Sequence, residues 1–194
     1  ILEAEEDAEW MVLEMGMSGQ GEIELLTQIG QPDAAIITNI GEAHLQQLGS
    51  RQEIAKAKME ITAGLKPGGI LVYPGEEPLL TELLALEPAT FFKTCGYAYE
   101  PSIKPVSVGF GDSNDVYPLS LQMDSGNDGY YFRLAGGSES FFIPLHGKHN
   151  VLNAMAAVVC AKQFGVTDAA IRKGLSRLTI SGMRADIVSL PSGA

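Results

Sequence analysis

A short apolar run at residues 34–37, AAII, passes directly into the polar loop TNIGEAH at residues 38–44. The run has the length and composition of a strand buried on both faces, which is typical of a parallel sheet. Ligands of open α/β sheets bind beyond the carboxyl ends of such strands. We therefore predict that Asn39, Glu42 and His44 lie at the binding edge of a sheet. The alternative is a turn in which His44 is merely solvated.

Strand and helix patterns alternate around this run. Strands are expected at residues 10–15, 34–39, 70–73, 90–94 and 185–190, and helices at residues 22–29, 52–65, 79–86, 150–164 and 167–178. Between residues 104 and 145 the pattern changes to short alternating runs separated by Gly, Asn, Asp and Ser, which predicts an antiparallel meander. The predicted fold is one α/β domain with a Rossmann-like, mostly parallel sheet flanked by helices and a small antiparallel β extension at residues 104–145.

The charge of the chain excludes some classes of partner. Its formal net charge is -11 over 194 residues, and no basic stretch interrupts this acidic field. We therefore expect neither a nucleic acid nor a membrane as a partner. The two cysteines, Cys95 and Cys160, lack the spacing of metal ligands, which favours buried thiols in a reducing compartment. Together these features predict a cytoplasmic protein.

Glu14 ends the apolar run at residues 10–13 and precedes the Gly-containing run at residues 16–19. If residues 10–13 form a neighbouring strand, its carboxylate emerges where His44 does. A carboxylate and an imidazole at adjacent strand ends can bind Mg²⁺ or Mn²⁺. Alternatively, Glu14 caps a helix or pairs with a lysine.

Lys58 shares a helical stripe with Ile54 and Ile61, whereas Lys56 points outward. A lysine on the face that packs against the sheet can snorkel to the edge of the domain. Alternatively, its amine is neutral and open to chemical modification, because burial lowers the pKa of a lysine.

The segment HGKHN at residues 146–150 leads into the helix expected next. Asn150 is the candidate N-cap, and the free backbone N–H groups behind it, together with Lys148, favour an anion. The spacing of His146 and His149 also fits a zinc pair, although no third ligand lies nearby in the sequence. A metal-dependent hydrolase that uses these two imidazoles with His44 is therefore one alternative function.

Four segments resemble the central ATPase domain of the Mur ligases. They are LEMG at residues 13–16, ITNIGEAH at 37–44, IAKAK at 54–58 and GKHNVLNA at 147–154. The Glu-Ala-His ending of the second segment is similar to the family member that joins D-alanyl-D-alanine to UDP-N-acetylmuramoyl-tripeptide. Folylpolyglutamate and cyanophycin synthetases share this domain and are the nearest competing interpretation.

The resemblance implies a role for each matching residue. Glu14 and His44 would bind Mg²⁺ near the phosphates of ATP. Lys58 would be carbamylated, and its added carboxylate would hold a second Mg²⁺. Asn39, in the loop of His44, is a further candidate for contact with the cofactor.

Three residues in the C-terminal part would complete the nucleotide site. Asn150 and His149 would lie beside the adenine or the ribose. Arg184 aligns with an arginine that helps to hold the nucleotide, and its charge suits a phosphate.

The activity that the resemblance implies is ATP-dependent peptide ligation in peptidoglycan precursor synthesis, through an acyl phosphate that the amine of D-alanyl-D-alanine attacks. The Gly-Lys-Thr phosphate loop of the family does not occur in this sequence. We expect residues 1–194 to be part of the central domain of a monomeric ligase, without the UDP-substrate domain and the C-terminal domain, inactive alone and prone to self-association. A non-catalytic binding domain that lost the phosphate loop is the rival interpretation.

Overall fold

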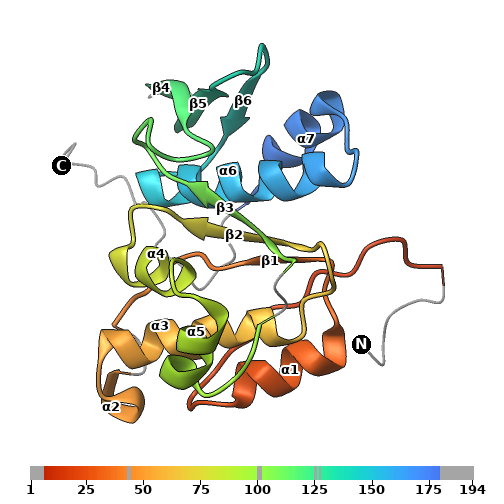
Figure 1. Ribbon diagram of the computed structural model, residues 1–194. Helices are drawn as coiled ribbons and strands as arrows, with labels where there is room; N and C mark the ends of the chain where they lie inside the picture. The colour runs from red at the N-terminus through yellow and green to blue at the C-terminus, as the bar shows by residue number, and fades with distance from the viewer. Residues whose placement is uncertain (1–6, 43–44, 100–101, 125, 127, 180–194) are drawn as a thin grey trace.

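The fold is described from a computed structural model, which covers residues 7–42, 45–99, 102–124, 126 and 128–179. Within these residues the chain forms two three-stranded sheets, ordered β1-β2-β3 and β4-β5-β6 (Figure 1). The strands are β1 (Ala34–Ile36), β2 (Ile70–Pro74), β3 (Lys104–Val108), β4 (Pro118–Asp124), β5 (Gly129–Leu134) and β6 (Ser140–Ile143). The helices are α1 (Glu22–Gly30), α2 (Leu45–Leu48), α3 (Arg51–Met59), the 3-10 helix η1 (Glu60–Ala63), α4 (Pro78–Leu84), α5 (Pro88–Cys95), α6 (Lys148–Gln163) and α7 (Asp168–Leu175).

The first sheet is parallel, with β2 at its centre. Ile70 lies opposite Ala34 of β1 on one side and opposite Lys104 of β3 on the other. Leu71 and Val72 of β2 are completely buried. Burial on both faces requires an apolar strand, which is why a continuous apolar run predicts a parallel sheet here. The α/β fold class expected from the sequence is confirmed.

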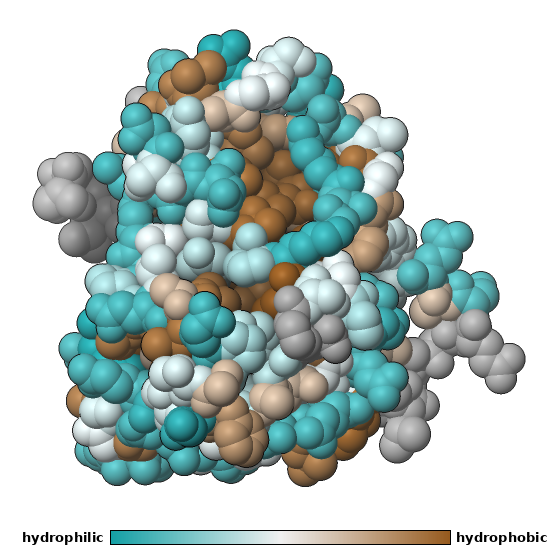
Figure 2. All heavy atoms as spheres, in the orientation of Figure 1, coloured by the Kyte–Doolittle hydropathy of each residue, from teal (hydrophilic) through white to brown (hydrophobic). Residues whose placement is uncertain are grey.

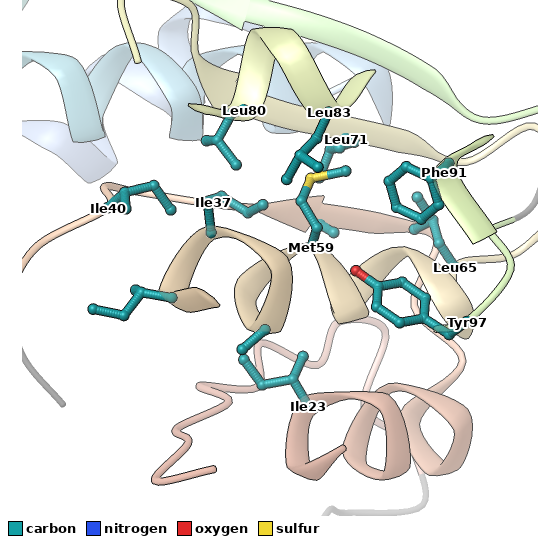
Figure 3. Packing of buried hydrophobic residues seen from close by; sticks show 14 of the residues in the cluster. Ile23, Ile37, Ile40, Met59, Leu65, Leu71, Leu80, Leu83, Phe91 and Tyr97 are labelled. Atoms are coloured by element: carbon teal, nitrogen blue, oxygen red, sulfur yellow. The ribbon is translucent and has the colours of Figure 1, made fainter. Parts of the chain in front are cut away.

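One face of this sheet is covered by α3, α4 and α5, with α1 packed beneath α3 (Figure 1). Helix α3 begins after Ser50, whose hydroxyl accepts a hydrogen bond from the backbone N–H of Glu53 at 3.2 Å. Figure 3 shows how Met59 of α3, Leu83 of α4 and Leu71 of β2 point toward one another in the core on this face. This packing fixes the face of α3 that looks toward the sheet.

The opposite face is covered by α6, which also supports the antiparallel sheet. Val151, Met155 and Val158 form its buried stripe and share one apolar cluster with Val72 of β2 and with strands β5 and β6. Figure 2 shows an apolar hollow in the upper half of the molecule, where β6 and α6 lie in Figure 1. Thr167 caps α7, since its hydroxyl accepts from the N–H of Ala170 at 3.3 Å. The predicted cap at this position is confirmed.

Two predicted strands are wrong. Residues 90–94 lie in helix α5, which begins at Pro88 and ends at Gly96 with a φ of 87°. A proline in the first turn and a left-handed glycine after the last turn delimit a helix, and they outweigh the β propensity of Thr and Phe. Residues 10–15 form neither strand nor helix, and the side chain of Val12 is 96% exposed. Without ladder hydrogen bonds to a neighbour, a short apolar run does not become a strand.

Two further expectations concern the ends of predicted elements. Strand β3 (Lys104–Val108) pairs in parallel with β2, so the antiparallel sheet begins at Pro118 and not at residue 104. The reason is the register of β3, which places Val106 opposite Val72. The strand predicted at residues 185–190 lies outside the described residues.

None of the described helices combines the length and the apolar character that are needed to span a bilayer.

Candidate functional site

A cavity of about 250 Å³ lies beyond the carboxyl end of β1. Its walls are residues 15–17, residues 36–39 with Gly41, one face of α3 and η1, and Ile23 of α1. The first three of these walls overlap three of the four stretches that carry the resemblance to Mur ligases. Residues 36–41 lie here because they follow β1, whereas the packing of α1 against η1 and α3 brings the other walls to the same place.

Lys58 is the charged side chain of this cavity. It lies half-buried beside Ile54 and Ile61, as the helical stripe predicts. Its Nζ donates to the backbone carbonyl of Asn39 at 2.7 Å and lies 3.3 Å from the Oδ1 of the same residue. Burial lowers the pKa of Lys58 below its ordinary value. The amine is thus held at the sheet edge, and the neutral form needed for chemical modification is more accessible than in an exposed lysine.

Lys56, two residues away, is held by different partners. Its Nζ pairs with Oε1 of Glu53 at 2.7 Å, and its backbone carbonyl accepts from the hydroxyl of Tyr97 at 2.8 Å. It does not line the cavity. The structure therefore separates the two lysines of the IAKAK segment as the sequence analysis expects.

The other predicted residues of this edge have different outcomes. Asn39 follows β1 and contacts Lys58, which confirms that it lies at the carboxyl end of the strand. Glu14 is exposed and precedes residues 15–16 of the cavity wall, but it does not end a strand. The reason is that residues 10–15 have no strand partner within the described part of the chain. His44 and Arg184 lie outside the described residues.

A buried carboxylate that the sequence analysis did not select lies behind the cavity. Glu60 is only 3% exposed. Its Oε1 accepts from the N–H of Gly21 at 2.7 Å and its Oε2 accepts from the N–H of Glu24 at 3.2 Å. The sequence offers little to select Glu60 beyond its position two residues after Lys58. Its partners become apparent only when α1 packs against η1 in the folded chain.

An arginine that the sequence analysis also missed links the loops after β1 and β2. Nη2 of Arg51 lies 2.7 Å from Oε2 of Glu77 and 3.1 Å from the carbonyl oxygen of Ile40. Glu76, the neighbouring carboxylate, accepts from the N–H groups of Phe110 and Gly111 at 2.7 and 2.8 Å. Both carboxylates after β2 therefore hold loops together within the protein.

The start of α6 differs from the prediction. The helix begins at Lys148, and Gly147, with a φ of 89°, occupies the N-cap position instead of Asn150. The side chain of Asn150 donates from Nδ2 to the carbonyl of His146 at 2.6 Å. Gly147 has a φ of 89°, a conformation that side-chain-bearing residues rarely adopt, and a Cβ there would also require the exposed ring of His149 to move. The predicted cap at Asn150 is therefore wrong, because the chain already enters the helix at the glycine.

The first residue of α6 lies near the end of β3. Nζ of Lys148 is 5.9 Å from the ring centroid of Phe110, which follows that strand. This contact places the HGKHN segment at the same edge of the sheet as the loops after β1 and β2. Within the described residues, no group of three His, Cys, Asp or Glu could hold a metal ion, so His146 and His149 do not form part of such a cluster there.

Comparisons with known proteins agree with this arrangement of sheet and loops. Residues 1–161 match the model of the Mur ligase middle domain. The chain belongs to the Mur ligase family. The Mur ligase model covers every segment of the sheet edge described above, including the start of α6. The α/β architecture expected from the resemblance is thus confirmed.

Several Mur ligases are similar to the chain over most of its length. The UDP-N-acetylmuramoyl-tripeptide--D-alanyl-D-alanine ligase of Bacillus subtilis is 44% identical over 193 residues, which are 100% of this chain and 38% of the relative. A crystal structure of MurF from Acinetobacter baumannii is 30% identical, with a TM-score of 0.78, over 98% of this chain and 39% of that one. MurF from Thermotoga maritima in complex with ADP shares the fold, with a TM-score of 0.63 and 23% identity over 86% of this chain and 35% of that one. The chain therefore spans less than two fifths of the length of these relatives.

Proposed function

We propose that the chain forms the middle domain of an ATP-dependent ligase that joins D-alanyl-D-alanine to UDP-N-acetylmuramoyl-tripeptide in peptidoglycan precursor synthesis. The 44% identity to the Bacillus subtilis ligase supports this choice of substrates. The observation that carries the proposal is Lys58, whose half-buried amine lies 2.7 Å from the carbonyl of Asn39 in a cavity at the sheet edge. The acidic composition fits a monomeric cytoplasmic enzyme without nucleic acid or membrane partners.

Lys58 is the proposed source of a metal-binding carboxylate. A neutral lysine amine adds CO₂ to form a carbamate, with a new N–C bond and release of one proton. The modified nitrogen retains one N–H, which can still donate to the carbonyl of Asn39, while two new oxygens become available to a cation. Because Mg²⁺ prefers oxygen ligands, the carbamate fits the metal, whereas the ammonium form repels it.

Glu14 and His44 are the other proposed metal ligands. Glu14 is exposed beside the cavity wall and offers a second carboxylate. His44 lies beyond the last described residue of the loop after β1, in the segment that resembles the family motif. When bound, Mg²⁺ would neutralise charge on the phosphates during transfer of the γ-phosphoryl group to the peptide carboxylate.

The start of α6 is a proposed site for ATP, with Asn150 and His149 beside the adenine or the ribose and the cations near the phosphates. Lys148 contributes a cation there, and Asn150 and His149 lie in the first turn of the helix. Backbone N–H groups at a helix N-terminus favour an anion, and Arg184 is a proposed additional phosphate contact. The complex of a Thermotoga maritima ligase of the same fold with ADP supports a nucleotide as the cofactor.

Lys58→Ala in the whole protein tests the proposal. We expect loss of most ATP-dependent ligation and partial recovery when acetate is added, because a small carboxylate replaces the missing metal ligand. Lys56→Ala is the matched control, since this lysine lies on the same helix but pairs with Glu53. Near-wild-type activity of Lys58→Ala would show that Lys58 only extends its amine to the edge of the domain and does not contribute to a metal site.

His44→Ala tests the second ligand in the same protein. It should raise the Mg²⁺ concentration required for turnover and leave the affinity for the UDP-linked peptide nearly unchanged. Ordinary turnover at ordinary Mg²⁺ would exclude His44 from the site.

A further inference from the structure

Glu60 is a buried carboxylate whose partners come from a distant part of the chain. It is 3% exposed, and charged side chains are almost never buried to this degree unless they are paired. Its two oxygens accept from the backbone N–H groups of Gly21 and Glu24, which precede it by 39 and 36 residues. Helix α1 has no side-chain cap of its own at Gly21. Glu60 therefore caps α1 from the neighbouring helix η1 and satisfies N–H groups of its first turn.

The same carboxylate connects two walls of the cavity. Glu60 follows Lys58 by two residues at the start of η1, so its backbone moves with the helix that carries the amine. Gly21 ends an irregular segment that contains Glu14 and also Met15 and Gly16 of the cavity wall. The pair of hydrogen bonds thus joins the end of this segment to η1, which follows directly after α3.

Other contacts also hold this segment, since Nε2 of Gln20 donates to Oε2 of Glu53 in α3 at 2.6 Å. The side chain of Met17 is buried, and the N–H of Ser18 donates to Oε2 of Glu22 at 2.7 Å. Gly21 itself has a φ of 82°, in the region that favours glycine, so the chain turns sharply at the residue that Glu60 holds. Loss of the carboxylate would leave the N–H groups of Gly21 and Glu24 without this acceptor and loosen the turn, while Gln20 keeps its hydrogen bond to Glu53.

We propose that Glu60 is a positioning residue, which holds the segment of Glu14 against the helix of Lys58 so that the proposed metal ligands on the two segments keep their spacing. This inference rests on the metal site of the proposed function. In this role Glu60 does not touch the metal or the nucleotide and acts only through the segments that it holds. Groups that orient metal ligands without touching the metal typically change metal affinity by about 10- to 100-fold when they are removed.

Glu60→Gln in the whole protein is the test. Glutamine keeps the shape of the side chain but offers one carbonyl oxygen and one NH₂ group, so it can accept only one of the two hydrogen bonds. We expect the dissociation constant for Mn²⁺, measured by electron paramagnetic resonance, to rise by roughly tenfold. Hydrogen exchange at the amides of Gly21 and Glu24 should accelerate, and the KM for the UDP-linked peptide should stay unchanged.

Thr27→Val is the matched control. Thr27 is completely buried, and its hydroxyl donates to the carbonyl of Ile61 at 3.0 Å, so it joins the same two helices through a single hydrogen bond that does not involve the turn at Gly21. Valine has nearly the same shape and removes only that hydrogen bond. We expect a lower melting temperature with unchanged Mn²⁺ affinity. Glu60→Asp, which keeps the charge on a shorter side chain, should show a smaller shift in affinity than Glu60→Gln and serves if the glutamine variant does not fold.

The outcomes distinguish the two proposals. Equal changes in Mn²⁺ affinity for Thr27→Val and the Glu60 variants, at equal loss of melting temperature, would overturn the positioning role. Wild-type Mn²⁺ affinity in Glu60→Gln, together with weak binding in Glu14→Ala, would overturn that role alone. Wild-type Mn²⁺ affinity and ligation in both Lys58→Ala and Glu14→Ala would overturn the metal site itself, and with it the task assigned to Glu60.

Discussion

Replacing Gly64 with Ala should strongly destabilise the junction between α1 and η1, which supports the cavity. Gly64 ends η1 with a φ of -111°, a conformation that alanine adopts without strain. An added Cβ would lie 2.3 Å from the carbonyl oxygen of Thr27, which is about 1.1 Å short of the 3.4 Å where ordinary contact begins. It would also lie 2.6 Å from the backbone nitrogen of Gln28. Because both atoms belong to the backbone of α1, the clash is relieved only if the helix moves.

The cost follows from two effects. Overpacking of this kind typically costs about 1 to 3 kcal/mol. Movement of α1 also stretches the buried hydrogen bond from Thr27 to Ile61, which contributes about 1 kcal/mol. We therefore expect a loss of about 3 kcal/mol in the free energy of unfolding. With a urea dependence of about 2 kcal/mol per molar, the midpoint should fall by about 1.5 M.

Urea unfolding of the 194-residue chain, followed by circular dichroism, measures this difference. Gly174→Ala is the control, because a Cβ at this position of α7 meets no atom within 4 Å. Alanine in a helix is favoured over glycine by up to about 1 kcal/mol, so this variant should be neutral or more stable. If both alanine variants unfold at the same urea concentration, the tight approach of α1 to Gly64 is not a feature of the folded protein.

Three further predictions concern the proposed chemistry. Because burial lowers the pKa of Lys58, its neutral amine forms at lower pH than that of an exposed lysine. A carbamate signal in ¹³C-bicarbonate NMR should therefore appear at lower pH than for an exposed lysine and grow as the pH rises. A signal that persists in Lys58→Met would refute this assignment. Asn150→Ala in the whole protein should raise the KM for ATP more than that for either peptide substrate, whereas an equal rise for all three would point to the lost hydrogen bond to His146. Calorimetric titration of the 194-residue chain with Mg-ATP should show no micromolar binding. The reason is that its sequence lacks the Gly-Lys-Thr loop, whose backbone N–H groups and lysine hold phosphates. Micromolar binding, or phosphate release that depends on His44, would contradict this.

Local sequence patterns were sufficient where a structural signal extends over only a few residues. The apolar run at residues 34–37 contains β1, and Thr167 gave the start of α7, because a run of apolar β-formers and a capping hydroxyl are local features of the sequence. The inward position of Lys58 followed from its spacing to Ile54 and Ile61 along one helix. Helical periodicity selects the face that packs against the sheet before any tertiary contact is known.

The same reasoning failed where the partner of a segment decides its conformation. Residues 90–94 have β propensity, yet Pro88 and Gly96 delimit a helix there. The apolar run at residues 10–15 resembles a strand, yet it is unpaired and exposed in the described structure. Strand formation requires ladder hydrogen bonds to another strand, which a single segment does not supply.

The sequence by itself determined the family, the α/β fold class and the residue types of the loop after β1, because these depend on composition and short spacing. Only the tertiary structure decided how the edge is held together. Arg51 and Glu77 are 26 residues apart, and Glu60 is 39 residues from Gly21, so no local pattern pairs them. A charged side chain acquires such a role only when folding brings an opposite charge or free N–H groups to it, because burial without these partners costs more than packing returns.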